Sequence, residues 1–499
     1  MTGRLLLCLM AALLLGGCYP EERIWWSPKG DRAVVLLADR VLHLMNAQGE
    51  LGPALFGGQS FEDWGVLTVA WLPDGSGILC SRTRQVRSWE AVKAQIPNDE
   101  AETVEKRLGE VIPTFQAMIK NRADPTTIQT IENLCEMKEK ALFMAGLRIL
   151  FQTRRGDIEQ LLRPLPHGEK LIAELDDPGK GFSVVELCLL KLDAAAPAEP
   201  QALATRLLSL LMAPRVSPRH EALAYLELNE GDDGENARLM VQTLDGKGRL
   251  EVAQRLSTLH YQWLPDGRSL VFTSPMAREG DSIQCVRRVT ALQASGELMK
   301  PAYELGADGK MGRVEGADRL SEARTLAMAV MPDRRALQVL PDGRVLFASQ
   351  PVTLPLAGDS VPLDPRLYVI SADGSTLHEV PTQPGDLPTD LNFFVVSPSG
   401  SHIAVVEKGT DAVALVEVDT GRTQIISELN PGWKCETVPA WKTDTELTFA
   451  GLDAVTKRPQ VKVWSAASGI SSLSEKWPAN ATEKWLSPPK SETPQAQSP

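Results

Sequence analysis

The stretch Gln262-Trp263-Leu264-Pro265-Asp266-Gly267 decides the fold, because it joins a short apolar strand to a turn and because related stretches return along the chain. Proline presets the first dihedral of a reverse turn, aspartate caps the turn, and glycine adopts the positive φ that reverses the chain. An apolar strand follows each copy, so each copy predicts a β-hairpin. The related turns lie at 25–31, 70–75, 215–218, 339–343, 395–400 and, in degenerate form, 439–444.

A second strand pair with its own turn follows these hairpins, for example at 42–49 and 239–246. Four strands per unit and a spacing of about 45 residues between Pro28 and Pro73 are typical of propeller blades. The sequence therefore predicts an all-β fold: a β-propeller of four-stranded blades over residues 24–476. Seven blades are favoured, and six or eight stay open because 301–330 has little pattern.

The S-P-x-G and L-P-D-G turns, each followed by an apolar strand and then by a strand ending in D-x-G or A-D-G, resemble the repeats of TolB-type propellers, periplasmic relatives of WD repeats. The resemblance covers roughly residues 24–476 and implies the fold. It implies no activity, because turn motifs carry no catalytic group. The chain departs from TolB in that its first blade begins a few residues after Cys18, without a separate α/β domain, so TolB's partners are not carried over.

An insertion interrupts the second blade, because some 100 residues more than a blade needs separate Pro73 from Pro218. Apolar residues at helical spacing run from Val104 to Met118 and again from Ile128 to Ile149. This pattern predicts an α-helical hairpin within residues 88–165. Either its apolar stripe packs on its own partner helix and the propeller rim, or part of the stripe docks another protein. We expect this hairpin to be the leading location for partner binding.

The N-terminus has the pattern of a signal peptide, because Arg4 precedes an apolar run of about 11 residues. The run is too short for a membrane-spanning helix, which needs roughly 20 residues. Leu15, Gly16 and Gly17 ahead of Cys18 resemble the lipobox of bacterial lipoproteins. The resemblance implies cleavage of a signal peptide, residues 1–17, and lipid attachment to Cys18. The alternative is an ordinary secretory signal with a chance cysteine.

The lipobox resemblance also implies a location. A fully acylated Cys18 anchors a protein stably to a membrane, which leaves 18–23 as a lipidated linker and the body facing the periplasm. Tyr19 favours the outer membrane, and display on the cell surface is the alternative. At the other end, the Pro- and Ser-rich composition predicts a disordered tail over 477–499.

Chemical motifs are scarce in the sequence. It contains no nucleophile elbow, zinc-binding helix or phosphate loop, and its six histidines are widely separated. We therefore predict no catalytic, cofactor-binding or metal-binding residue, and we expect that the chain is not an enzyme. The net charge of -12 argues against nucleic acid as a partner.

Four tryptophans recur just before the turns, and a repeated position of this kind predicts structural packing. The function expected is that of a membrane-tethered, protein-binding scaffold of the cell envelope, with an envelope protein as partner. The alternatives are a propeller enzyme, such as a glycan-active lyase or hydrolase, and a sensor of a small ligand in the central channel. The four tryptophans are Trp26, Trp71, Trp263 and Trp441.

Overall fold

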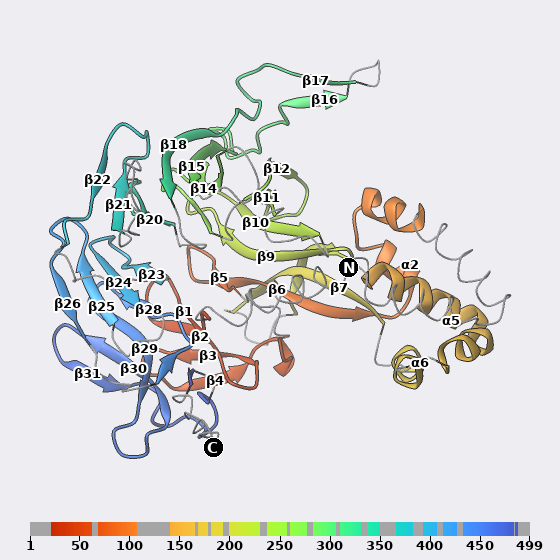
Figure 1. Ribbon diagram of the computed structural model, residues 1–499, viewed down its shortest axis with the longest axis horizontal. Helices are drawn as coiled ribbons and strands as arrows, with labels where there is room; N and C mark the ends of the chain where they lie inside the picture. Colours follow the sequence, from red (N-terminus) through yellow and green to blue (C-terminus); the bar gives the residue numbers. More distant parts are fainter. Residues whose placement is uncertain are drawn as a thin grey trace, which may run out of the picture.

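Seven four-stranded antiparallel sheets follow one another in chain order around a propeller ring (Figure 1). This computed structural model confirms the predicted all-β fold and the favoured count of seven blades. The residues that it describes are 21–61, 68–106, 140–164, 168–177, 181–192, 199–229, 237–256, 260–276, 283–305, 310–330, 337–349, 366–382, 393–406, 413–426, 433–483 and 485–487.

Each blade takes its four strands in chain order, and in blade 4 two further strands intervene before the last one. Blade 1 is β1 (Ile24–Trp26), β2 (Arg32–Leu36), β3 (Leu42–Asn46) and β4 (Leu51–Ala54); blade 2 is β5 (Ala70–Trp71), β6 (Gly77–Val86), β7 (Phe182–Lys191) and β8 (Gln201–Arg206); blade 3 is β9 (Ser209–Val216), β10 (Ala222–Asn229), β11 (Arg238–Thr243) and β12 (Arg249–Ala253); blade 4 is β13 (Tyr261–Trp263), β14 (Ser269–Pro275), β15 (Ile283–Thr290) and β18 (Arg324–Val330). Blade 5 is β19 (Gln338–Val339), β20 (Val345–Ser349), β21 (Arg366–Ile370) and β22 (Leu377–Glu379); blade 6 is β23 (Phe393–Val396), β24 (His402–Val406), β25 (Val413–Glu417) and β26 (Thr423–Ile425); blade 7 is β28 (Ala440–Thr443), β29 (Glu446–Leu452), β30 (Pro459–Ser465) and β31 (Gly469–Ser472).

The L-P-D-G turns behave as their chemistry predicts. Asp266 accepts hydrogen bonds from the backbone N–H groups of Arg268 (2.8 Å) and Ser269 (2.9 Å), and Gly267 has a φ of 68°. A Cβ on Gly267 would lie 2.7 Å from the Cβ of Arg219, which belongs to the turn of the preceding blade. Glycine is therefore needed twice, for the reversal of the chain and for the close approach of neighbouring blades.

Tryptophans tie neighbouring blades together near the axis. The indole N–H of Trp71 donates to the carbonyl of Trp25 in the preceding blade (2.8 Å), and Trp263 donates in the same way to Arg215 (3.0 Å). Trp441 repeats the contact with the carbonyl of Val395 (3.0 Å). The predicted structural role of these tryptophans is confirmed, because each satisfies its indole N–H across a blade interface.

The ring closes between blades 7 and 1 through a modified form of this contact. Trp26 donates to the hydroxyl of Thr448 (3.1 Å), which in turn donates to the carbonyl of Ala440 (2.8 Å). Outside the seam, β27 (Lys434–Cys435) pairs with β32 (Leu486–Ser487).

The interface between blades 7 and 1 also corrects the predicted tail boundary at residue 477. Trp477 and Trp485 are 9% and 1% exposed and share a core with blades 1 and 7. The N–H of Trp477 donates to the carbonyl of Gly49, 2.6 Å away. The folded chain therefore continues to Ser487, because two large rings fill the last blade interface, and residues 488–499 lie outside the described residues.

Two insertions extend from the ring (Figure 1). One is helical and joins β6 to β7: it contains α2 (Trp89–Lys93), a helical segment at 98–106, α5 (Lys140–Leu162) and α6 (Gly168–Asp176). The other is a β-hairpin between β15 and β18, formed by β16 (Tyr303–Leu305) and β17 (Met311–Arg313). Among the described helices, none has the length and apolar character that crossing a membrane requires.

Candidate functional site

The predicted lipid-attachment residue Cys18 and the lipobox residues Leu15, Gly16 and Gly17 lie outside the described residues. Much of the predicted helical hairpin, residues 107–139, also lies outside them. The candidate sites that can be compared are the helical insertion near its base, the β16–β17 hairpin and the central channel.

The base of the helical insertion packs on the propeller. Val92, Ile96 and Val104 are buried in one cluster with Phe182 of β7 and Leu207 of the β8–β9 turn. Helix α5 buries Leu147, Leu150, Ile158 and Leu162 as well. The helical content of blade 2 was predicted correctly, but the insertion extends past residue 165 to include α6.

A buried carboxylate fastens this base to blade 3. Glu100 accepts hydrogen bonds from the backbone N–H groups of both Leu207 and Leu208, each 2.9 Å away, and lies 3.9 Å from Arg206. Burial is the main reason that the pKa of Glu100 is raised from its ordinary value. Because two otherwise unpaired N–H groups depend on it, Glu100 acts as a clasp between the insertion and the β8–β9 turn.

A second buried carboxylate lies beside this clasp. Glu227, whose side chain is 3% exposed, contacts Arg238 (2.8 Å), Arg249 (3.2 Å) and Arg206 (3.4 Å), and a cavity of about 220 Å³ adjoins them. All three guanidinium groups are thus engaged by one carboxylate. Two further carboxylates lie nearby, Glu100 at 3.9 Å from Arg206 and Glu251 at 3.7 Å from Arg238, and we assign the cluster to stability.

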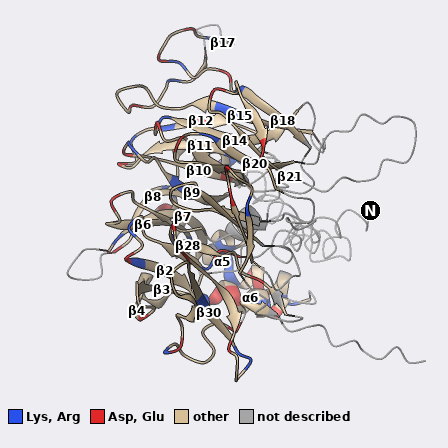
Figure 2. Cartoon of the chain, turned by 90° about the vertical axis from the view of Figure 1, so that its left-hand side faces the viewer, with Lys and Arg blue, Asp and Glu red and all other residues tan. Residues whose placement is uncertain are grey.

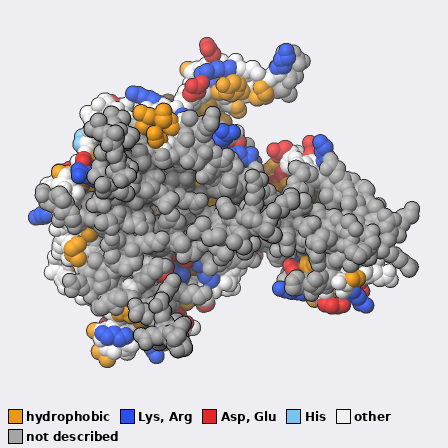
Figure 3. Space-filling model, in the orientation of Figure 1, with side chains coloured by type: hydrophobic (Ala, Val, Ile, Leu, Met, Phe, Trp, Pro, Cys, Tyr) orange, Lys and Arg blue, Asp and Glu red, His pale blue; other side chains and the backbone are white. Residues whose placement is uncertain are grey.

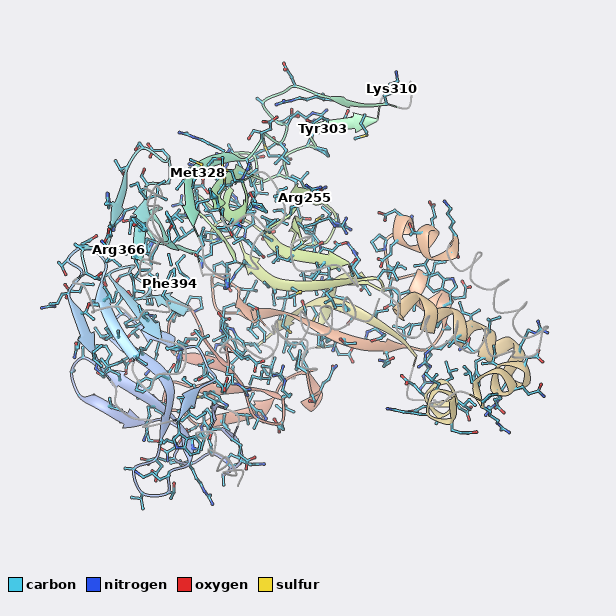
Figure 4. The ribbon with its side chains drawn as sticks, in the orientation of Figure 1. Arg255, Tyr303, Lys310, Met328, Arg366 and Phe394 are labelled. Carbon is cyan, nitrogen blue, oxygen red and sulfur yellow. The ribbon has the colours of Figure 1, made fainter. Side chains whose placement is uncertain are left out.

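The β16–β17 hairpin shows the opposite character. Tyr303 and Met311 are 52% and 63% exposed, and they project from the hairpin into solvent. Figures 1 and 2 show the hairpin extending beyond the blades from two directions, and Figure 3 shows hydrophobic side chains gathered on it. Figure 4 places Tyr303 and Lys310 along it. An isolated two-stranded ribbon has little core of its own, so these side chains are not held by packing.

The charged side chains around this hairpin pair with one another. Lys300 meets Asp318 at 2.7 Å, and Arg313 meets Glu322 at 3.1 Å. Arg319 also forms an ion pair with Glu304. The apolar side chains are therefore the unsatisfied surface of the hairpin. A further exposed methionine of the same blade, Met328 on the outer strand β18, is 62% exposed (Figure 4).

The central channel contains a cavity of about 450 Å³ between the first strands of blades 1 to 4. Aromatic rings dominate its wall, and their indole N–H groups are already bonded to the protein. Arg32 stacks over Trp71 at 5.6 Å and Lys442 over Trp26 at 5.5 Å, so a cation covers one face of each of these rings. The lining residues are Trp25, Trp26, Val69, Ala70, Trp71, Arg215, Val216, Pro218, Gln262 and Trp263.

Charged groups from three blades influence one another at this channel. Glu22 accepts a hydrogen bond from Trp25 (2.9 Å), and the charges of Arg215 and Glu22 both act on His260. Burial, and then the charge of Arg215, lower the pKa of His260 to about 4. His260 is therefore neutral near pH 7, and Arg215 is the cation that lines the cavity. Within the described residues, no group of His, Cys, Asp or Glu side chains could hold a metal ion.

Comparisons with known proteins find distant matches among solved structures. No family model matches the sequence, and no curated protein matches it. Among solved structures, the chain is similar to TolB from Acinetobacter baumannii (16% identity, TM-score 0.32), covering 56% of this chain and 57% of TolB. It is also similar to a puromycin hydrolase (12% identity, TM-score 0.44), covering 93% of this chain and 55% of that one.

A third similar structure is an oligogalacturonate lyase in complex with manganese (13% identity, TM-score 0.37), covering 81% of this chain and 74% of that one. The expectation that the chain is not an enzyme is corrected here, because solved structures that match it include a hydrolase and a lyase. Absence of a catalytic sequence motif does not exclude a site assembled from different blades.

Several residues of these sites were not predicted from the sequence. Tyr303 and Met311 lie in strands of three residues each, which leave no periodicity to detect. Arg215 acquires its surroundings from four blades, and Glu227 meets arginines of its own blade and of the end of blade 2. The one usable signal was the recurrence of the pre-turn position, which places Val216, and so its neighbour Arg215, beside the axis.

Proposed function

We propose that this protein is a lipid-anchored component of the cell envelope whose propeller acts as a scaffold, and that it binds another envelope protein through the β16–β17 hairpin. The observation that carries the proposal is the exposure of Tyr303 and Met311 on a hairpin that projects from the ring (Figures 1 and 3). Exposed apolar side chains gathered on a projecting element are typical of protein interaction sites. The anchor, on Cys18, rests on the lipobox resemblance, as does the location facing the periplasm, with the outer membrane favoured.

A protein is the partner that suits this surface. The neighbouring ion pairs, Lys300 with Asp318 and Arg313 with Glu322, consume charge that a nucleic acid or an anionic membrane would need. Tyrosine and methionine are enriched at protein interfaces. We therefore propose a partner with an apolar cleft that receives Tyr303 and Met311.

The helical insertion, where the sequence analysis placed partner binding, is a weaker candidate for the interface than the β16–β17 hairpin. At its base, Val92, Ile96 and Val104 pack on β7 and the β8–β9 turn, and α5 and α6 bury further apolar residues. In the described part of the insertion, no large hydrophobic side chain is among those most exposed to solvent. The insertion therefore supports the ring, and the hairpin is the better candidate for contact with a partner.

Site-specific photocrosslinking in intact cells tests the proposal. A photoreactive residue replaces Met311 in one strain and Val455 in another, because Val455 is an 88% exposed hydrophobic residue on blade 7. We expect one discrete adduct from position 311, none from position 455, and loss of the adduct when Tyr303→Ser is added. Equal adducts from both positions, or an adduct insensitive to Tyr303→Ser, would contradict the proposed interface.

The anchor has a separate test. Metabolic labelling with a radioactive fatty acid should mark the wild-type protein, and Cys18→Ser should remove the label and release the protein from membranes. Labelling of the Cys18→Ser variant would contradict the lipoprotein assignment.

A further inference from the structure

We propose that the central channel is a binding site for a small organic anion with a flat, apolar body, and that Arg215 is the residue that holds its anionic group. This site is distinct from the β16–β17 hairpin and does not depend on the proposed function. It rests on the aromatic wall of the cavity and on the guanidinium of Arg215, which forms no ion pair with a described carboxylate.

The tryptophans of the cavity present ring surface and no free donor. Trp25 donates its N–H to Glu22, Trp71 to the carbonyl of Trp25, and Trp263 to the carbonyl of Arg215. The bond of Trp71 crosses from blade 2 to blade 1 and that of Trp263 from blade 4 to blade 3, so these rings are held in place before any ligand arrives. A rigid aromatic wall favours a flat, apolar ligand, because little side-chain freedom is lost on binding.

Arg215 is the charged residue among those that line the cavity, and the amide of the other polar residue, Gln262, is already bonded to Gln338 and Val339. In the described part of the chain no carboxylate forms an ion pair with its guanidinium, although its backbone carbonyl accepts from Trp263. By contrast, the three arginines around Glu227 are all paired. An unpaired guanidinium in a partly apolar cavity binds a carboxylate, sulfonate or phosphate group through charge-assisted hydrogen bonds.

Neighbouring groups support an anion over a cation. His260 is neutral near pH 7, because burial and the charge of Arg215 lower its pKa to about 4. The carboxylate of Glu22 is occupied by the indole N–H of Trp25. Arg32 and Lys442, stacked on two of the rings, add further positive charge close to the wall. The volume, about 450 Å³, is within the range of sites for small organic ligands.

Isothermal titration calorimetry with the full mature chain tests the site. The probes are 1-naphthoate, which combines a carboxylate with a flat aromatic body, 1-naphthamide, which lacks the charge, and cyclohexanecarboxylate, which lacks the flat ring. We expect saturable binding of 1-naphthoate and binding of the two other probes that is at least about tenfold weaker.

The variants give the decisive comparison. Arg215→Gln should weaken 1-naphthoate about ten- to a hundredfold and leave 1-naphthamide unchanged, since one charge-assisted contact is lost. Arg255→Gln, at an exposed arginine outside the cavity (Figure 4), is the matched control and should bind as the wild type does. Thermal unfolding of both variants checks that the ring is intact.

Three results would overturn the proposal. They are no saturable binding of 1-naphthoate to the wild type, equal affinity for 1-naphthoate and 1-naphthamide, and equal loss of affinity in Arg215→Gln and Arg255→Gln. None of these bears on the hairpin, so the channel site and the proposed partner interface stand or fall separately.

Discussion

The two insertions of this propeller differ in how they treat their apolar side chains. The helical insertion of blade 2 buries Val92, Ile96 and Val104 against the ring, and Glu100 clasps it to the β8–β9 turn. The hairpin of blade 4 leaves Tyr303 and Met311 exposed. The larger insertion, whose helical pattern is visible in the sequence, therefore packs its apolar side chains on the ring. The smaller β16–β17 hairpin, which has no such pattern, exposes its apolar side chains to solvent.

The largest expected effect on stability comes from removing Glu227 from the ion cluster beside the helical insertion. Glu227→Ala leaves Arg206, Arg238 and Arg249 without their shared carboxylate and should lower the free energy of unfolding by about 3–5 kcal/mol. Urea unfolding measures it. Glu379→Ala, which breaks the more exposed pair with Arg366, is the control and should cost less than about 1 kcal/mol. Equal losses of stability in the two variants would show that the buried cluster stabilises the fold no more than an exposed ion pair does.

The clasp itself should give the next effect. Glu100→Ala removes the acceptor of two backbone N–H groups and should cost about 1–3 kcal/mol. Hydrogen exchange at Leu207 and Leu208 should speed up, while exchange in β16 and β17 stays as in the wild type. Unchanged protection at both amides would mean that the insertion does not depend on Glu100.

A smaller effect should appear in the pH dependence of the same clasp. Burial raises the pKa of Glu100, so the folded protein binds a proton more readily than the unfolded chain does. Its contribution to stability is therefore present at low pH and is lost as pH rises from about 4.5 through the raised pKa. The free energy of unfolding of the wild type should therefore fall relative to that of Glu100→Gln as pH rises across this window. A difference independent of pH would refute the assignment.

The smallest effect on stability is expected at the hairpin. The double variant Tyr303→Ser and Met311→Ser should change the free energy of unfolding by less than about 0.5 kcal/mol, since both side chains are exposed. The same variant should lose the photocrosslinked partner. A loss of stability as large as that of Glu100→Ala would place these side chains in the folded core and break the comparison.

The sequence predicted best what local chemistry determines. The turn around Asp266 and Gly267 and the repeated tryptophans follow from residues close together in the chain, and they fixed the propeller and its blades. The helical insertion was visible through its 3.6-residue periodicity.

Contacts between segments distant in the chain could not be predicted from the sequence. The end of the fold was placed at residue 477, because nothing nearby indicates that Trp477 bonds to Gly49 and that Trp485 fills the seam of blades 1 and 7. The same holds for Arg215, whose cavity wall comes from four blades. Three-residue strands such as β16 leave no pattern, so the hairpin was missed.

Hydrogen exchange of the protein in its own envelope tests the central claim most directly. Exchange is measured by mass spectrometry for the purified protein in lipid vesicles and for the protein in native envelope vesicles. We predict that peptides covering β16 and β17 gain protection in native envelopes, while peptides covering α6 and the clasp at Leu207 do not change. Protection gained over the helical insertion, with none at the hairpin, would contradict the account and return the partner interface to blade 2.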